Sequence, residues 1–382
     1  MPENQESMLN RALTSEIRDS LLNSGQIIVL YGARQTGKTT LASEILKHVQ
    51  GKVLRINADE NKYLDVLSSR DFDKINLLIS GYDMLFIDEA QRISDIGINL
   101  KIIHDNRPDL KILVTGSSSF DLANKLNEPL TGRTLTYRLF SFSLSELKTE
   151  MSVFEMQENL EKFMVYGLYP GIYTVDNASL KEKKLTELST AYIYKDIFEL
   201  SSVRNTSKVR DLLRMLAFQI GSEVSIPELG RALALSQETV NQYIDLLENA
   251  FIVFRMGAFS GNLRKEISKK SKVYFWDTGI RNSLINNFSG LNFRNDIGPL
   301  WENFVVADRM KFLSCSGLNT NSYFWRTYTG AEIDYMEERN GTFKGFEIKW
   351  SKNKVRFPQA WIDIYGNDVS LINRSNFFEF LV

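Results

Sequence analysis

Residues 32–40 read GARQTGKTT and have the glycine and lysine spacing of a loop that binds nucleotide phosphates. The loop follows the apolar run QIIVLY and precedes TTLASEILKHV, which has the pattern of a helix. Glycines let a backbone wrap closely around a triphosphate and point N–H groups inward, and the helix N-terminus adds partial positive charge. We therefore expect ATP and Mg²⁺ as cofactors, with Lys38 on the β and γ phosphates and the Thr39 hydroxyl on the metal. The predicted nucleotide-binding residues are Gly32, Ala33, Arg34, Gln35, Thr36, Gly37, Lys38, Thr39 and Thr40.

Two acidic residues end another apolar run, DMLFIDEAQ. A carboxylate at a strand end can hold Mg²⁺, and the carboxylate beside it can polarise the attacking water, so we assign Asp88 to the metal and Glu89 to catalysis. The alternative is a solvated acidic turn. A third apolar run, KILVTGSSS, ends in the hydroxyl residues Thr115, Ser117 and Ser118.

The phosphate loop and the Asp88–Glu89 pair together resemble the AAA-type ATPases. The resemblance implies that the KILVTGSSS strand lies between the other two and ends in a γ-phosphate sensor, for which Thr115, Ser117 and Ser118 are the candidates. Ser117 is therefore included among the predicted nucleotide-binding residues, and the asparagine usual in that family is absent here. It also implies a catalytic role for Arg133, which precedes the strand TLTYRLF at a position that often supplies an arginine finger to a neighbouring subunit. A structural arginine paired within its own domain is the alternative. A finger acting in trans would require a homo-oligomer.

A second set of acidic and basic residues lies in GAEIDYMEERNGTFKGFEIKWSKNK. Asn340 and Gly341 predict a hairpin turn between two strands. On the second strand Glu347 and Lys349 share one face and Phe346, Ile348 and Trp350 the other, because side chains alternate. On the first strand we expect Ile333 and Tyr335 to face inward and Asp334 to point the opposite way. The hairpin can then bring Asp334, Glu347 and Lys349 together, and two carboxylates near a lysine can bind Mg²⁺ and orient a water for phosphodiester attack.

Twelve residues separate Asp334 from Glu347, and this layout resembles the PD-(D/E)xK nuclease superfamily. Many members add a glutamate on a preceding helix, and GPLWENFVVADRM offers Glu302 there. The resemblance implies Asp334, Glu347 and Glu302 as metal ligands, with Glu347 and Lys349 catalytic. The same short pattern also occurs on ordinary amphipathic strands. A domain with the nuclease-like fold but without cleavage activity is a further alternative.

Between these two regions, SIPELGRALALSQETVNQYIDLLENAFIVFRM has the layout of a helix, a turn, a helix and a strand, and resembles a winged helix. Ser225 and Glu228 predict a capping box around Pro227, and Ser236 predicts a second cap. The second helix has acidic residues and lacks Lys and Arg, which favours packing or protein contact over reading a DNA groove. The following stretch concentrates positive charge and could bind phosphates or be a solvated loop; its residues are Arg264, Lys265, Lys269, Lys270 and Lys272.

Strand patterns alternate with helix patterns over residues 1–150, which predicts a parallel sheet covered by helices on both faces. We expect an α/β fold: a P-loop NTPase parallel sheet with helices on both faces, then a helical and winged-helix region, then an α/β restriction-endonuclease-like domain. The predicted boundaries are an ATPase domain over 1–150, a helical connector over 151–215, a winged-helix-like domain over 216–265 and a nuclease-like domain over 266–382.

The net charge of −1 over 382 residues argues against a chain that is basic overall, so any nucleic-acid surface must be local. One cysteine excludes an internal disulfide framework, and two histidines are too few for a zinc site. No apolar stretch reaches the ~18 residues of a membrane span, and the polar start lacks a signal core. We expect a cytoplasmic protein without membrane contact.

The whole order resembles a large family of bacterial and archaeal ATPases with a C-terminal domain of unknown function and a nuclease-like core. The strand end IDEAQ and the stretches AYIYKDI (191–197) and YFWDTG (274–279) carry this resemblance. It implies this architecture. Because both carboxylate sets are complete, we expect an ATPase that controls a metal-dependent C-terminal domain able to cleave DNA or RNA. The alternatives are an ATP-driven switch or a DNA-binding regulator whose C-terminal domain binds without cleaving.

Overall fold

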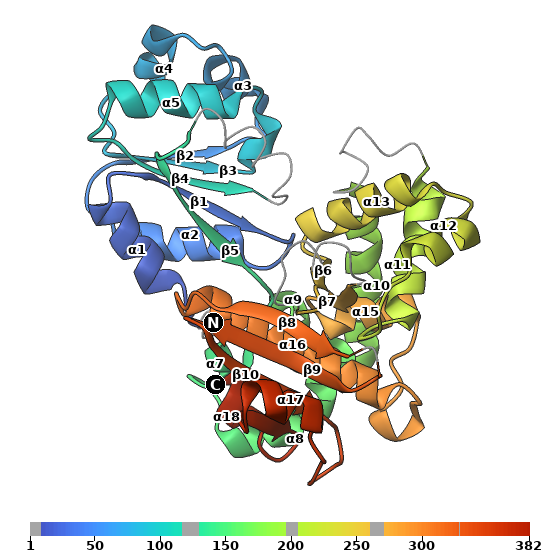
Figure 1. Cartoon of the computed structure of the whole chain (residues 1–382). Helices are drawn as coiled ribbons and strands as arrows, with labels where there is room; N and C mark the ends of the chain where they lie inside the picture. The colour runs from blue at the N-terminus through green and yellow to red at the C-terminus, as the bar shows by residue number, and fades with distance from the viewer. Residues whose placement is uncertain (1–8, 117–129, 196–204, 260–270, 328) are drawn as a thin grey trace. The chain divides into compact units, whose positions relative to one another are not determined.

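The computed structural model describes residues 9–116, 130–195, 205–259, 271–327 and 329–382 (Figure 1). The chain divides into two compact units. The first ends at Phe140 and also includes Asn249–Phe251, and the second comprises Ser141–Glu248 and Ile252–Val382. Apart from Asn249–Phe251, the three segments predicted after residue 150 therefore lie in one compact unit, and their separate boundaries stay a prediction.

The first unit is built on a five-stranded parallel sheet in the order β2-β3-β4-β1-β5. Helices α1 and α2 cover one face and α3, α4 and α5 the other (Figure 1), which confirms the predicted class. The strands are β1 (Ile27–Gly32), β2 (Val53–Asn57), β3 (Met84–Asp88), β4 (Lys111–Gly116) and β5 (Thr134–Leu139). The helices are α1 (Thr14–Asn23), α2 (Lys38–Lys47), α3 (Asn61–Leu67), α4 (Phe72–Ile79) and α5 (Ile96–Asn106), with a 3₁₀ turn over Ala90–Arg92.

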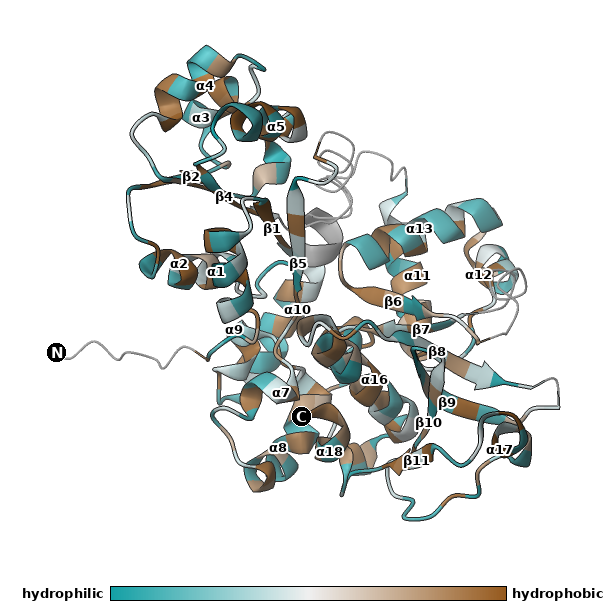
Figure 2. Ribbon diagram, turned by 60° about the vertical axis from the view of Figure 1, so that its left-hand side comes forward, coloured by the Kyte–Doolittle hydropathy of each residue, from teal (hydrophilic) through white to brown (hydrophobic). Residues whose placement is uncertain are grey.

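Continuous apolar runs make the central strands of this sheet. Every residue of β1 is buried, as expected for a parallel strand covered on both faces, and Figure 2 shows the central strands β1 and β4 as hydrophobic. Because the strands are parallel, their carboxyl ends meet at one edge. β4 lies between β1 and β3, as predicted, so Gly32, Asp88 and Gly116 end neighbouring strands. The strand predicted over TLTYRLF is one residue shorter, since β5 ends at Leu139.

The second unit begins with helices, which confirms the helical reading of the described part of 151–215. A helix, a turn and a helix follow, and a two-stranded antiparallel sheet pairs β6 with β7. The helices of this part are α7 (Leu144–Leu147), α8 (Val153–Tyr166), α9 (Pro170–Tyr173), α10 (Ala178–Lys195), α11 (Thr206–Phe218), α12 (Ile226–Leu233), α13 (Gln237–Asn249) and α15 (Thr278–Leu284), and the strands are β6 (Val253–Met256) and β7 (Lys272–Phe275).

The two predicted helix caps differ in outcome. Ser236 accepts a hydrogen bond from the Thr239 N–H at 3.1 Å, which confirms the second cap. Ser225 precedes α12, but its side chain accepts no capping hydrogen bond, so the predicted capping box is wrong. Pro227 in the first turn pre-sets the helical backbone without needing the box.

The C-terminal part of the second unit is a mixed four-stranded sheet in the order β11-β10-β9-β8. The hairpin prediction is confirmed: Arg339 pairs with Thr342 across Asn340 and Gly341, which both have positive φ, as a tight hairpin turn requires. The strands are β8 (Asn321–Arg326), β9 (Glu332–Arg339), β10 (Thr342–Ile348) and β11 (Val369–Ile372); the helices are α16 (Ile297–Cys315), α17 (Gln359–Tyr365) and α18 (Phe377–Leu381), with a 3₁₀ turn over Leu291–Phe293.

A β-bulge in β9 overturns one predicted face assignment. Tyr323 pairs with Met336 but Trp325 pairs with Ile333, so β9 carries one extra residue in this interval. Ile333 therefore packs with Met336, whereas Tyr335 contacts Phe346 at a ring-centroid distance of 5.9 Å. Ile333 and Tyr335 do not share a face, because the bulge breaks the alternation at Asp334 and Tyr335.

No helix within the described ranges is long and apolar enough to cross a membrane.

Candidate functional site

The phosphate loop is held by hydrogen bonds among its own residues. The Lys38 ammonium is buried and donates to the carbonyls of Gly32 and Ala33, each at 2.8 Å. The Thr36 hydroxyl also donates to the Ala33 carbonyl at 2.8 Å. Gly37 has φ +92°, a conformation that a residue with a side chain rarely adopts, and α2 begins at the next residue. The loop is therefore folded around its lysine, with the helix N-terminus at its end.

Close packing explains why the loop begins with glycine. A Cβ added at Gly32 would lie 2.2 Å from the carbonyl oxygen of Leu139, the last residue of β5. Only a residue without a side chain fits at this distance. The first glycine of the motif thus joins β1 directly to the neighbouring strand.

Residues from two neighbouring strands, β3 and β4, meet a residue of α2 beside the loop. The Thr39 hydroxyl donates to Asp88 Oδ2 at 2.8 Å, and the Thr115 hydroxyl donates to Asp88 Oδ1. The structure thus brings together both residues predicted to hold Mg²⁺. Thr115, one of the candidate phosphate sensors, forms a hydrogen bond with Asp88. Ser117 and Ser118, the other candidate phosphate sensors, lie outside the described residues.

Glu89 adopts a left-handed backbone conformation with φ +54°, an unusual one for a glutamate and one found often at functional sites. Its N–H donates to the Thr115 hydroxyl at 3.3 Å, and its carboxylate accepts a hydrogen bond from the Gln91 amide. No role was predicted for Gln91, which is the last residue of the IDEAQ run. Its contact fixes the orientation of the predicted catalytic carboxylate.

Arg133 lies at the amino ends of the strands, whereas the phosphate loop lies at their carboxyl ends. It precedes Thr134, which pairs with Ile27 at the start of β1, whereas the loop follows the end of β1. Its guanidinium forms an ion pair with Asp105 at 2.9 Å, and hydrogen bonding to Arg133 lowers the pKa of Asp105. Arg133 is therefore paired within its own unit. Its role as an arginine finger for a neighbouring subunit stays a prediction.

The C-terminal hairpin brings three predicted residues together. The Lys349 ammonium lies 2.5 Å from Asp334 Oδ2 and 2.9 Å from Glu347 Oε2, and the Ile348 N–H donates to Asp334 at 2.8 Å. Burial and the negative charge of Asp334 raise the pKa of Glu347 to about 7. Burial disfavours the charged form of Lys349, but both carboxylates outweigh burial and raise its pKa. The site thus concentrates negative charge around one ammonium group.

Glu302 is engaged by other partners. Its carboxylate accepts from the Lys272 ammonium at 3.0 Å and from the Tyr274 hydroxyl at 2.7 Å. Lys272 also forms an ion pair with Glu332 at 2.7 Å. Burial raises the pKa of Glu302, Lys272 opposes this, and Asp334 adds to it, so the two carboxylates feel each other's charge. Lys272 is 3% exposed, which contradicts its assignment to a solvated or phosphate-binding basic stretch; Arg264, Lys265, Lys269 and Lys270 lie outside the described residues.

The donor set around Lys349 fits a magnesium ion. Mg²⁺ usually takes one or two carboxylates and keeps several waters, and Asp334 and Glu347 supply two. Within the described residues, however, no group of three or more acidic, histidine or cysteine side chains is arranged to hold a metal. Glu302 is therefore not assembled with the other two as a third ligand.

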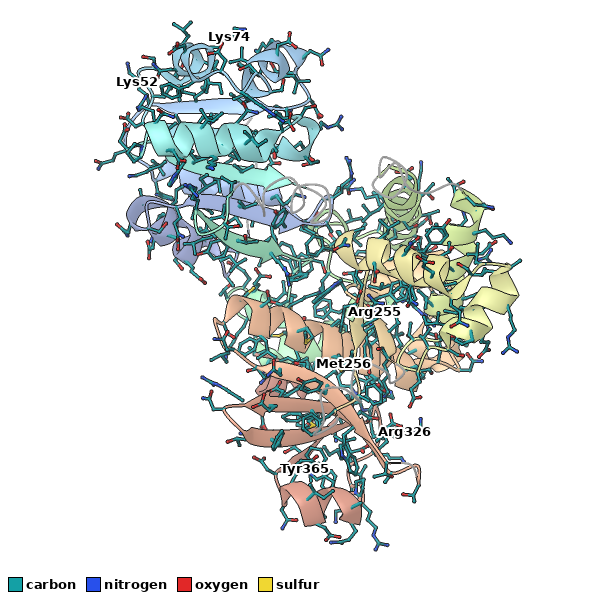
Figure 3. All side chains as sticks on the ribbon, turned by 45° about the horizontal axis from the view of Figure 1, so that its top comes forward. Lys52, Lys74, Arg255, Met256, Arg326 and Tyr365 are labelled. Atoms are coloured by element: carbon teal, nitrogen blue, oxygen red, sulfur yellow. The ribbon has the colours of Figure 1, made fainter. Side chains whose placement is uncertain are left out.

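The acidic second helix uses part of its charge internally. The guanidinium of Arg255 on β6, labelled in Figure 3, forms ion pairs with Asp245 and Glu248 of α13. These contacts join α13 to the strand that follows it. They support the packing role that the sequence favours for this helix.

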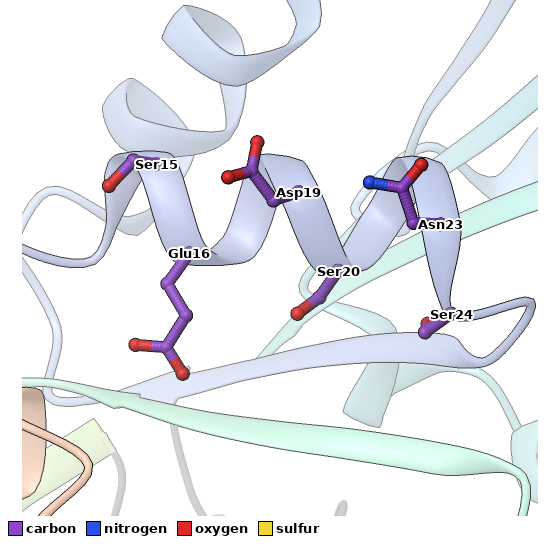
Figure 4. Close-up of a pocket in the computed structure, with 6 residues that line it drawn as sticks. All are labelled: Ser15, Glu16, Asp19, Ser20, Asn23 and Ser24. Atoms are coloured by element: carbon purple, nitrogen blue, oxygen red, sulfur yellow. The ribbon is translucent and has the colours of Figure 1, made fainter.

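A surface hollow on α1 offers no alternative nucleotide site. Figure 4 shows that its lining side chains all project from this helix and its end. Glu16 and Asp19 are acidic and would repel a phosphate. The lining residues are Ser15, Glu16, Asp19, Ser20, Asn23 and Ser24.

Comparisons with known proteins agree with the first unit's architecture. Residues 24–148 match the family model described as an AAA domain. Residues 157–291 and 297–368 match two models described as domains of unknown function, DUF8612 and DUF4143. The Walker-type ATPase of Pyrococcus abyssi has a similar fold, with a TM-score of 0.52 and 16% identity, covering 74% of this chain and 97% of that one.

Two relatives are similar over most of the chain. An uncharacterized protein of Mycobacterium tuberculosis is 28% identical over 336 residues, which covers 86% of this chain and 71% of the relative. An uncharacterized protein of Methanocaldococcus jannaschii is 27% identical over 332 residues, which covers 81% of this chain and 72% of the relative. The matched AAA domain and the loop geometry together indicate an AAA-type P-loop domain in the first unit, and the matches to domains of unknown function follow it.

Proposed function

We propose that the chain hydrolyses ATP in its first unit to control a Mg²⁺-dependent nucleic-acid-cleaving site in its second unit. The observation that carries the second half of this proposal is the position of Lys349, within 2.9 Å of both Asp334 and Glu347. A lysine beside two carboxylates can stabilise the charge that develops on a phosphodiester during attack by water. The site supplies this group and two oxygen ligands in one place.

In the first unit, Thr39 and Asp88 would hold Mg²⁺ and Glu89 would orient and polarise the attacking water. The metal would neutralise phosphate charge when bound, and Lys38 would contact the β and γ phosphates. The contact between the Thr39 hydroxyl and Asp88 at 2.8 Å supports this assignment, since it places both candidate ligands side by side. Hydrolysis at such a site needs orientation of the groups more than covalent chemistry.

In the second unit, Asp334 and Glu347 would hold the metal, whose bound form supplies Lewis-acid activation of water. The high pKa of Glu347 supports a cation here, because its cause is burial beside another carboxylate, and a divalent ion relieves that repulsion. The β-bulge also supports a functional site, because bulges re-aim side chains and are frequent next to active sites. Glu302 would act as a neighbouring charge held by Lys272.

A side-by-side assay of cleavage and ATP turnover tests this function. Wild-type protein is incubated with ATP and Mg²⁺ or Mn²⁺ on linear, circular and branched DNA and on RNA. We expect cleavage that falls about 100-fold in Lys349→Ala, while ATP hydrolysis stays within about twofold. Lys344→Ala on β10, the strand that ends just before Lys349, is the matched control, because Lys344 is exposed and outside the site. Intact substrates in every wild-type reaction, or equal cleavage by Lys349→Ala, would contradict the proposal.

An ATP-driven switch that binds without cleaving is the second candidate. The pairing of Lys272 with Glu302 favours it, because an ammonium group already compensates the third predicted ligand. Calorimetric titration with Mn²⁺ distinguishes the two. Binding that disappears in Asp334→Asn supports the nuclease, whereas no binding to wild-type protein supports the switch.

A further inference from the structure

Arg11, which precedes α1, contacts two parts of the ATPase unit that are far apart in the sequence. Its Nη1 donates to the Thr36 carbonyl at 2.7 Å, and its Nη2 donates to the Phe140 carbonyl at 2.8 Å. Thr36 belongs to the phosphate loop, and Phe140 follows β5. A planar guanidinium can hold two acceptors in a fixed geometry, which a lysine cannot do. The side chain therefore fixes the loop relative to the backbone after β5.

The contact at Thr36 also orients a phosphate-binding group. In a trans peptide the carbonyl and the following N–H point in opposite directions. While Arg11 holds the Thr36 carbonyl, the Gly37 N–H must point away from Arg11. A charged donor on the carbonyl also polarises the peptide and strengthens its N–H as a donor. Arg11 thus pre-orders one of the backbone donors that a phosphate loop uses.

The contact at Phe140 lies where the chain leaves the ATPase unit. This unit ends at Phe140 and takes up the chain again over Asn249–Phe251. The rings of Phe140 and Phe251 meet edge to face, with centroids 5.9 Å apart. Phe251 has φ +57°, a strained conformation for an aromatic residue, and it is 6% exposed. The contact between Phe140 and Phe251 therefore joins the two points at which the chain leaves this unit.

We propose that Arg11 is a positioning residue that couples the phosphate loop to the chain exit at Phe140. Phosphate binding draws on the Gly37 N–H, shifts the Thr36 carbonyl that Arg11 holds, and changes the hold of Arg11 on the Phe140 carbonyl. The sequence reading missed Arg11, because 25 residues separate it from Thr36 and 129 from Phe140. This coupling rests on the ATPase domain alone and does not require nuclease activity.

Nucleotide affinity and hydrogen exchange, measured on the full chain, test the coupling. The exchange readout is the peptide that covers residues 139–147, with and without a non-hydrolysable ATP analogue. In Arg11→Gln we expect the Kd of a fluorescent ATP analogue to rise about tenfold and the nucleotide-dependent change in exchange to disappear. In Arg11→Lys we expect a smaller rise in Kd and the same loss of the exchange response.

The matched control is Arg18→Gln on α1, whose guanidinium pairs at the surface with the adjacent Asp19 at 3.3 Å. It removes the same charge from the same region and should behave as wild type in both measurements. An exchange response that persists in Arg11→Gln, or that is absent from wild type, would overturn the proposal. Should Arg11→Gln fail to fold by circular dichroism, Arg11→Lys decides: a wild-type response refutes the coupling, and its loss supports it.

Discussion

At the scale of single residues, Lys38 carries the clearest consequence. Its ammonium is buried on two loop carbonyls, so it is already placed where phosphates would lie. We expect Lys38→Ala to weaken ATP binding about 100-fold and to abolish hydrolysis. Lys47→Ala on the same helix is the control, since Lys47 pairs with Glu44 on the surface. Equilibrium binding and phosphate release measure both effects, and turnover retained by Lys38→Ala would refute the loop assignment.

Residue-level prediction from the sequence succeeded where the chemistry depends on neighbours in the chain. The loop around Lys38 and the Asp88–Glu89 pair have fixed local spacing, and the structure brings Thr39 to Asp88. Lys272 shows the limit. Its neighbours in the chain are basic, but its partners Glu302 and Glu332 come from a distant helix and strand. Ion pairs between distant segments leave no local pattern.

At the scale of elements, Gly279 joins α15 to the end of α8. A Cβ there would lie 2.1 Å from the Tyr166 carbonyl, a backbone atom that cannot move easily. We expect Gly279→Ala to lower the free energy of unfolding by about 1–3 kcal/mol or more. Gly298→Ala on α16 is the matched control, since a Cβ there meets no atom within 4 Å, and stability should stay equal or rise slightly. Urea denaturation measures both, and equal midpoints for the two variants would contradict this packing.

Asp308 on α16 gives an element-scale dependence on pH. It is buried and accepts the Leu144 N–H at 3.1 Å, which ties α16 to the start of α7. Burial raises the pKa of Asp308 to about 7, and Lys311 and the Leu144 N–H oppose this only in part. Between about pH 4 and pH 7 the unfolded state therefore loses a proton that the folded state keeps, so stability falls as pH rises.

Comparison with Asp308→Asn isolates this effect, because asparagine has a similar shape and does not titrate. We expect the stability difference between pH 5 and pH 7.5 in urea denaturation to be smaller in Asp308→Asn than in wild type. Asp363→Asn on α17, where the carboxylate is exposed, should keep the wild-type difference. A wild-type pH dependence in Asp308→Asn would show that Asp308 is not its source.

The β-bulge of β9 explains why the predicted faces of this strand were wrong. Alternation alone placed Ile333 and Tyr335 on one face, whereas the extra residue puts them in different clusters. The bulge arises from the pairing of β9 with β8, and no pattern within the β9 sequence predicts it. The parallel sheet was predictable, by contrast, because its central strands are apolar runs and strand patterns alternate with helix patterns along this part of the chain.

At the scale of the whole molecule, the order of parts follows from the sequence, but their division does not. The phosphate loop, the helix-turn-helix and the hairpin each appear where predicted. The chain nevertheless forms two compact units, with α13 leading back to the first unit at Asn249–Phe251. A short apolar segment that returns to an earlier unit looks like any other core segment, so sequence patterns do not reveal it.

We propose that ATP turnover in the first unit controls nucleic-acid cleavage by the second. The most direct measurement is the rate of nucleic-acid cleavage by the full chain in three states: without nucleotide, with ATP, and as Glu89→Gln with ATP. Glu89→Gln should bind ATP but hydrolyse it at least about 100-fold more slowly. We predict that the cleavage rates with and without turnover differ at least about tenfold, which corresponds to about 1.4 kcal/mol of coupling. Equal rates in all three states, including no cleavage in any, would contradict the account.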